Sequence, residues 1–173
     1  MYRAGMATLA VSAVGLDRPG IIAGVAGSLA AHGANITDSR MAILRGHFAM
    51  TLIVEGAERE ALDADLAQLG LEAYSVAEVA EAAANPRSQP NAVVSVHGAD
   101  HPGIVAAVTR VLAEAGANVC DLQTRLAREL YVMIIDVAVP PDPGLEALDA
   151  SLQAVAAEQG VALTLRPADA DVL

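Results

Sequence analysis

Apolar residues follow two different periods along the first half of the chain, and these periods predict its elements. A two-residue period is typical of a strand with one buried face, and a spacing of three or four residues is typical of an amphipathic helix. Gly33 and Gly70 fit the usual position just past a helix end. The predicted order is a strand at 7–14, a helix marked by Ile21, Val25 and Leu29, strands at 34–44 and 47–55, a helix marked by Leu62, Leu66 and Leu69, and a strand at 75–79.

The second half repeats this order of elements. Asp142 and Pro143 predict the N-cap and the first position of its last helix. Each half is therefore predicted to be an α+β, ferredoxin-like βαββαβ domain with both helices on one face of an antiparallel sheet. The predicted elements are a strand at 92–96, a helix marked by Ile104, Val108 and Leu112, strands at 117–126 and 130–139, a helix marked by Leu145, Leu148, Leu152 and Val155, and a strand at 161–165.

A direct repeat underlies the two halves. Residues 17–38 align with residues 100–121 without a gap, at an offset of 83 residues, and 12 of the 22 aligned positions are identical. The repeat predicts two domains, at 1–84 and 92–173, because a chain of 173 residues is long enough for two small domains. Residues 85–91 between them, rich in Pro and Asn, are predicted to be a linker.

One predicted strand of the second half is apolar on both faces. Its alternate residues are Tyr131, Met133, Ile135 and Val137 on one face and Leu130, Val132 and Ile134 on the other. One face is expected to meet the helices, and the other needs a cover, which either the sister domain or a second chain can provide. The pattern therefore favours a homo-oligomer, and a homodimer is the simplest.

The charge of the chain argues against several partners. The net charge is −11, and the ten basic residues are all arginines, five before Pro86 and five after it, so no basic patch is expected and direct binding to nucleic acid is disfavoured. No apolar run approaches the length of a membrane span, so we expect a protein that does not enter membranes. The single cysteine, Cys120, excludes a disulfide within the chain, which fits a reducing cytoplasm, and it is expected to be a small core residue.

The repeated turn has the form Asp-x-Pro-Gly between a strand and a helix. The proline is expected to start the helix, and the glycine lets another group approach the backbone. The free N–H groups at such a helix start suit a carboxylate or a phosphate, and the aspartate suits an ammonium group, so the turn can hold both ends of an amino acid. The alternative is structural, with the aspartate as a helix cap and the later Gly-Ala-Asn as a helix-end turn.

The residues of the turn, the Gly-Ala-Asn-Ile segment and the element order resemble the ACT domain, a small regulatory module that binds amino acids. The resemblance implies a ligand at an interface between two such domains, held by the turn and by the asparagine of the following strand. Both copies have Asp where some serine-sensing members have Asn. The implied ligand-binding residues are Asp17, Arg18, Pro19, Gly20, Ile21, Asn35 and Ile36 in the first copy and Asp100, His101, Pro102, Gly103, Ile104, Asn118 and Val119 in the second.

The resemblance implies a non-enzymatic regulator of amino-acid or one-carbon metabolism that binds a small amino acid of the glycine or serine class and needs no cofactor. The net negative charge of the chain implies that any control of transcription would act through a protein partner. One alternative is an oligomerisation or docking module without a ligand. Another is an enzyme related to the formyltetrahydrofolate deformylases, whose N-terminal domain has a similar turn, although we expect no counterpart of their catalytic domain here.

Two histidines near the second turn suggest a metal site, but we do not predict one. His97 and His101 are four residues apart in a segment where strand and turn geometry do not align their side chains. The first copy has Val14 and Arg18 at these positions. The difference between Arg18 and His101 predicts two chemically unequal sites with unequal occupancy.

Overall fold

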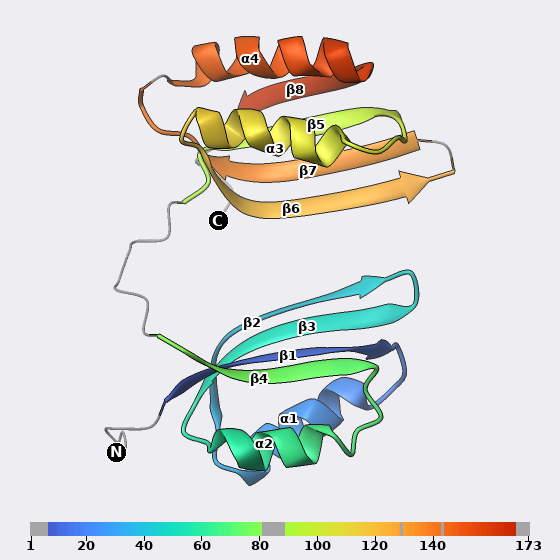
Figure 1. Cartoon of the computed structure of the whole chain (residues 1–173), viewed down its shortest axis with the longest axis vertical. Helices are drawn as coiled ribbons and strands as arrows, with labels where there is room; N and C mark the ends of the chain where they lie inside the picture. Colours follow the sequence, from blue (N-terminus) through green and yellow to red (C-terminus); the bar gives the residue numbers. More distant parts are fainter. Residues whose placement is uncertain (1–6, 81–88, 129, 143, 169–173) are drawn as a thin grey trace. The chain divides into compact units, whose positions relative to one another are not determined.

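The computed structural model describes residues 7–80, 89–128, 130–142 and 144–168. The chain divides into two compact units, Met1–Ala83 and Ala84–Leu173. Each unit contains a four-stranded antiparallel sheet with two helices on one of its faces, in the order βαββαβ (Figure 1). This arrangement confirms the predicted ferredoxin-like α+β fold.

The first unit has the strand order β2-β3-β1-β4. Leu69 was predicted to lie in its second helix, but the helix ends three residues earlier, and the Leu69 amide instead donates to the Leu66 carbonyl in a following turn, at 3.1 Å. The elements are β1 (Thr8–Leu16), α1 (Ile21–Ala31), β2 (Asn35–Leu44), β3 (His47–Glu55), α2 (Arg59–Leu66) and β4 (Ala73–Val79).

The second unit repeats this topology with the strand order β6-β7-β5-β8. Its last helix begins at Gly144; Pro143, predicted to be the first helical residue, lies outside the described residues. Most of the predicted linker also lies outside the described residues. Its last residue, Asn91, is described, and its side-chain amide forms hydrogen bonds with both the carbonyl and the N–H of Val139. The elements are β5 (Ala92–Ala99), α3 (Ile104–Glu114), β6 (Asn118–Ala127), β7 (Leu130–Ala138), α4 (Gly144–Gln159) and β8 (Val161–Pro167).

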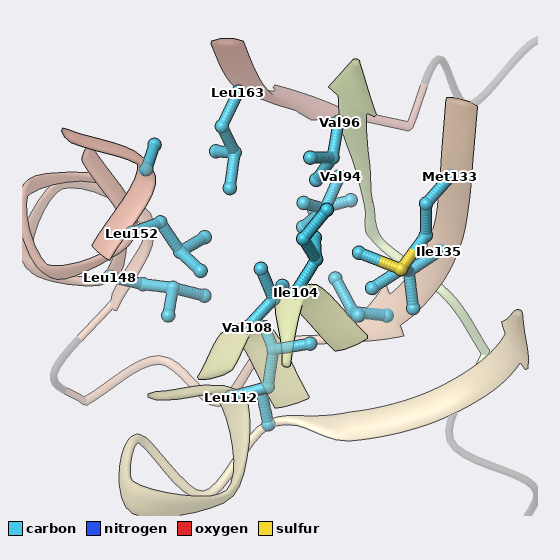
Figure 2. Packing of buried hydrophobic residues seen from close by; sticks show 14 of the residues in the cluster. Val94, Val96, Ile104, Val108, Leu112, Met133, Ile135, Leu148, Leu152 and Leu163 are labelled. Carbon is cyan, nitrogen blue, oxygen red and sulfur yellow. The ribbon is translucent and has the colours of Figure 1, made fainter. Parts of the chain in front are cut away.

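The core of each unit lies between its sheet and its two helices. In the second unit, alternate residues of β5 and β7 share one buried cluster with the residues that recur at four-residue spacing on α3. Figure 2 shows Val94 and Val96 of β5 and Met133 and Ile135 of β7 in this cluster. Ile104, Val108 and Leu112 are all buried there, as are Ile21, Val25 and Leu29 in the first unit. The helical spacing read from the sequence therefore marks the buried face of both first helices.

The opposite face of the second sheet carries exposed apolar side chains. Leu130 and Ile134 on β7 are each 48% exposed, whereas their neighbours Tyr131 and Ile135 are buried. The helices of the unit cover only the other face, as the two-faced pattern of this strand predicts. Within the described part of the chain, no helix has both the length and the apolarity needed to cross a membrane.

Candidate ligand-binding site

The first turn (residues 17–20) and the second turn (residues 100–103) join strand to helix through the same backbone geometry. Gly20 has φ 89° and ψ −8°, and Gly103 has φ 106° and ψ −16°. In the first turn, the Ile21 amide donates to the Arg18 carbonyl at 3.3 Å, which gives a type II turn with proline and then glycine at its centre. The prolines therefore precede the helices instead of starting them, because the left-handed glycine comes between.

The two helix starts are not capped by side chains. Helical hydrogen bonding begins with the Gly24 amide on the Gly20 carbonyl, at 2.8 Å, and with the Ala107 amide on the Gly103 carbonyl, at 2.9 Å. The residue before each helix makes no side-chain cap bond. The amides of residues 22–23 and 105–106 precede this ladder at the positive end of the helix, where a carboxylate is favoured.

The aspartates of the turns are not caps. Asp17 and Asp100 are exposed, and each precedes the capping glycine by three residues. Among the described residues, neither carboxylate takes part in a side-chain hydrogen bond or ion pair. The predicted alternative that these acids cap the helices is therefore wrong, and both carboxylates face solvent.

The cations of the turns are already engaged. An Arg18 Nη2 hydrogen donates to the Leu69 carbonyl at 2.7 Å, just beyond α2. His101 Nε2 lies 2.8 Å from the carbonyl of Gln159, the last residue of α4, and its Nδ1 lies 3.1 Å from the Pro102 carbonyl. Because a helix C-terminus attracts positive charge, each cation ties its turn to the end of the second helix of its unit.

The contacts of His101 favour its charged form. Only an imidazolium donates from both ring nitrogens, and both nitrogens here face carbonyl oxygens. The carbonyl of Gln159 raises the pKa of His101 above 6.5, that of Pro102 adds to the rise, and the negative charge of Asp100 contributes further. The two turns are therefore unequal, since the guanidinium of Arg18 keeps its charge at any physiological pH.

The second turn borders a hollow of about 320 Å³. Its wall also includes Tyr131, at the start of β7. This residue lies 28 residues after Gly103 and was not among the predicted site residues. The repeat offers a signal that could have found Tyr131, because at the 83-residue offset this tyrosine stands where the first copy has Phe48. The residues that line the hollow are Asp100, His101, Pro102, Gly103, Ile104, Val105, Ala106 and Tyr131.

A smaller hollow of the first unit, about 220 Å³, lies at the start of α2 and away from the first turn. Its wall carries three acids, Glu58, Glu60 and Glu78, against one cation, Arg59, and this excess of negative charge disfavours a carboxylate ligand. We therefore assign no amino-acid site to it.

The predicted asparagines do not lie beside the turns of their own domains. Asn35 pairs with Glu55 at one end of β3, whereas His47 at the other end pairs with Leu16, the residue before the first turn. Eight residue steps along β3 correspond to about 26 Å. Asn118 is separated from the second turn in the same way, along β7. A single domain therefore does not bring turn and asparagine together.

A β-bulge follows each asparagine. The register shifts between Ile36 and Asp38, and again between Val119 and Asp121. The bulge leaves Thr37 and Cys120 outside the regular strand pairing. Cys120 is exposed, so the prediction that it lies in the core is wrong. Ile36 and Val119, which the ACT resemblance places in the site, are also exposed.

Comparison with known protein families gives a match to the ACT domain over residues 7–74 and again over 91–166. The chain belongs to the ACT domain family. A UPF0237 protein of Methanopyrus kandleri is 44% identical over 80 residues, which cover 45% of this chain and 88% of that protein. The glycine cleavage system transcriptional repressor of Escherichia coli is 29% identical over 121 residues, which cover 68% of this chain and 64% of the repressor.

Solved structures show the same tandem ACT fold. An unknown protein from Galdieria sulphuraria has a TM-score of 0.73 at 30% identity, covering 95% of this chain and 99% of its own. A protein provisionally assigned as a glycine cleavage system transcriptional repressor has a TM-score of 0.70 at 21% identity, covering 94% and 98%. The fold of this ACT chain thus matches solved structures along nearly its whole length.

The His101 contact predicts a pH-dependent stability of the second domain. A raised folded-state pKa means that the contact is fully present below about 6.5, the ordinary pKa of histidine, and is lost as the pH rises through the raised value. The thermal midpoint of the wild-type chain should therefore fall relative to that of His101→Arg over this window. Calorimetry from pH 5.5 to 8.5 measures the difference, and NMR titration gives the pKa. Parallel pH profiles, or a His101 pKa at or below 6.5, would contradict the assignment.

Proposed function

We propose that the chain is an amino-acid-sensing regulator without catalytic activity of its own, which binds a small amino acid of the glycine or serine class at the second turn. One observation carries the proposal: the hollow at this turn borders both an unengaged carboxylate, that of Asp100, and the uncapped start of α3. These groups match the two charges of a free amino acid, since a carboxylate holds an ammonium group and a helix start favours a carboxylate.

The asparagine of the implied site comes from another domain in this proposal. Because Asn118 and the second turn are at opposite ends of their own sheet, only a second ACT domain can place an asparagine beside the turn. A second copy of the chain supplies such a domain, and the exposed apolar side chains of Leu130 and Ile134 support such pairing. The proposed regulator is therefore a homodimer whose association depends on the ligand.

Regulation follows from a population shift in this proposal. The amino acid stabilises one arrangement of ACT domains, and that arrangement exposes or hides a surface for a protein partner. The likeness to the glycine cleavage system transcriptional repressor supports a role in amino-acid or one-carbon metabolism in the cytoplasm. A net charge of −11 supports control of transcription through a partner and not through direct contact with DNA.

Removal of the Asp100 charge should weaken amino-acid binding. Calorimetric titration of the wild-type chain with glycine and with L-serine should show binding, and Asp100→Ala should reduce the affinity by about tenfold or more, the effect of losing one charge-assisted hydrogen bond. Asp63→Ala is the matched control, because it removes the same charge from an exposed position on α2. Absence of heat with either amino acid at millimolar concentration would refute the sensing function.

The mass in solution tests the proposed assembly. Sedimentation equilibrium should give twice the 17.6 kDa mass of the chain, with a tighter association when the amino acid that binds is present, because a ligand held between two copies stabilises their pairing. A mass of one chain at all concentrations would contradict the homodimer. A dimer indifferent to both amino acids would instead favour the docking module without a ligand.

A further inference from the structure

Tyr131 is a buried tyrosine beside the second turn. The residue is 8% exposed and forms part of the wall of the hollow, together with Asp100. Its hydroxyl donates to the Met133 sulfur at 3.6 Å. A thioether is a weak acceptor, so this hydrogen bond is easily exchanged for one to a charged oxygen.

The first copy shows that the hydroxyl is not needed for packing. Phe48 occupies the position equivalent to Tyr131, at the start of β3, and is fully buried in the core of its unit. A phenyl ring alone therefore fills this place in the fold. Because the Met133 sulfur is only a weak acceptor, the buried hydroxyl of the second copy would gain from a stronger one.

The other side chains around the hollow leave a place for a neutral donor. His101 uses both ring nitrogens on backbone carbonyls, and the carboxylate of Asp100 would repel the carboxylate of an amino acid. A hydroxyl of Tyr131 offsets this repulsion without adding a charge. Burial and the nearby charge of Asp100 both raise the pKa of Tyr131, which keeps its proton in place for donation.

We propose that Tyr131 is the specificity-determining residue of the second turn, and that its hydroxyl donates a hydrogen bond to the carboxylate of the bound amino acid. Asp100 then holds the ammonium group, so that the turn selects a zwitterion. The inference rests on the proposed amino-acid-sensing function. It also assigns the occupied site to the second copy, since Phe48 offers no such donor to the first turn.

The test is binding of L-serine to three proteins, the wild-type chain, Tyr131→Phe and Tyr74→Phe. Tyr131→Phe should bind L-serine about tenfold more weakly, the effect expected for losing one hydrogen bond to a charged group. Tyr74→Phe removes the same hydroxyl from β4 of the first unit and should bind like the wild type. L-serinamide has a neutral amide in place of the carboxylate, so its affinity should fall less than twofold on the Tyr131→Phe change, and a loss as large as that of L-serine would overturn the assigned contact.

Tyrosine spectroscopy gives a second readout that needs no variant. The chain has three tyrosines and no tryptophan, so saturation with L-serine should change the ultraviolet spectrum of tyrosine in the wild type. The change should vanish in Tyr131→Phe and persist in Tyr74→Phe.

The outcomes separate this inference from the function on which it rests. Equal affinity of Tyr131→Phe and wild type for L-serine, or no tyrosine signal on saturation, would overturn the role of Tyr131 and leave the sensing function standing. An equal loss in Tyr74→Phe would also overturn it, because the effect would then be general. No binding of either glycine or L-serine to the wild-type chain would overturn both.

Discussion

The reversal of the chain at Gly20 and Gly103 is the constraint on which both the fold and the candidate site depend. The φ angle is 89° at Gly20 and 106° at Gly103, and residues with a Cβ rarely adopt such positive values. The turn sends the end of a strand into a helix that packs back onto the same sheet. Because glycine makes the reversal without a capping side chain, the first amides of the helix stay available to an anion.

The two copies share this backbone and differ in the side chains around it. Arg18 and His101 both tie their turns to the end of a second helix, but only the histidine changes its charge near neutral pH. Phe48 and Tyr131 both fill the core beneath, but only the tyrosine brings a hydroxyl. Duplication thus accounts for the architecture, and these differences make the two turns chemically unequal, which is the basis on which the proposed site is assigned to the second turn.

The spacing of apolar residues predicted the order of the elements and their buried faces, because each strand and helix must turn one apolar face toward the core. Leu69 kept the period of α2 yet lies beyond its end, since a turn can continue a helical spacing. The bulge that exposes Cys120 leaves no mark in local sequence. The repeat located the turns, but Tyr131 lies in a different element, and the separation of Asn118 from its turn follows from topology alone.

Binding of an amino acid at the second turn is the central claim, and NMR of the ¹⁵N-labelled chain tests it most directly. Addition of L-serine or glycine should shift the amide resonances of Val105 and Ala106, which lie at the uncapped helix start that would meet the ligand carboxylate. The resonances of Ile22 and Ala23 should move far less. Unchanged resonances at the second turn, with millimolar amounts of either amino acid, would contradict the account.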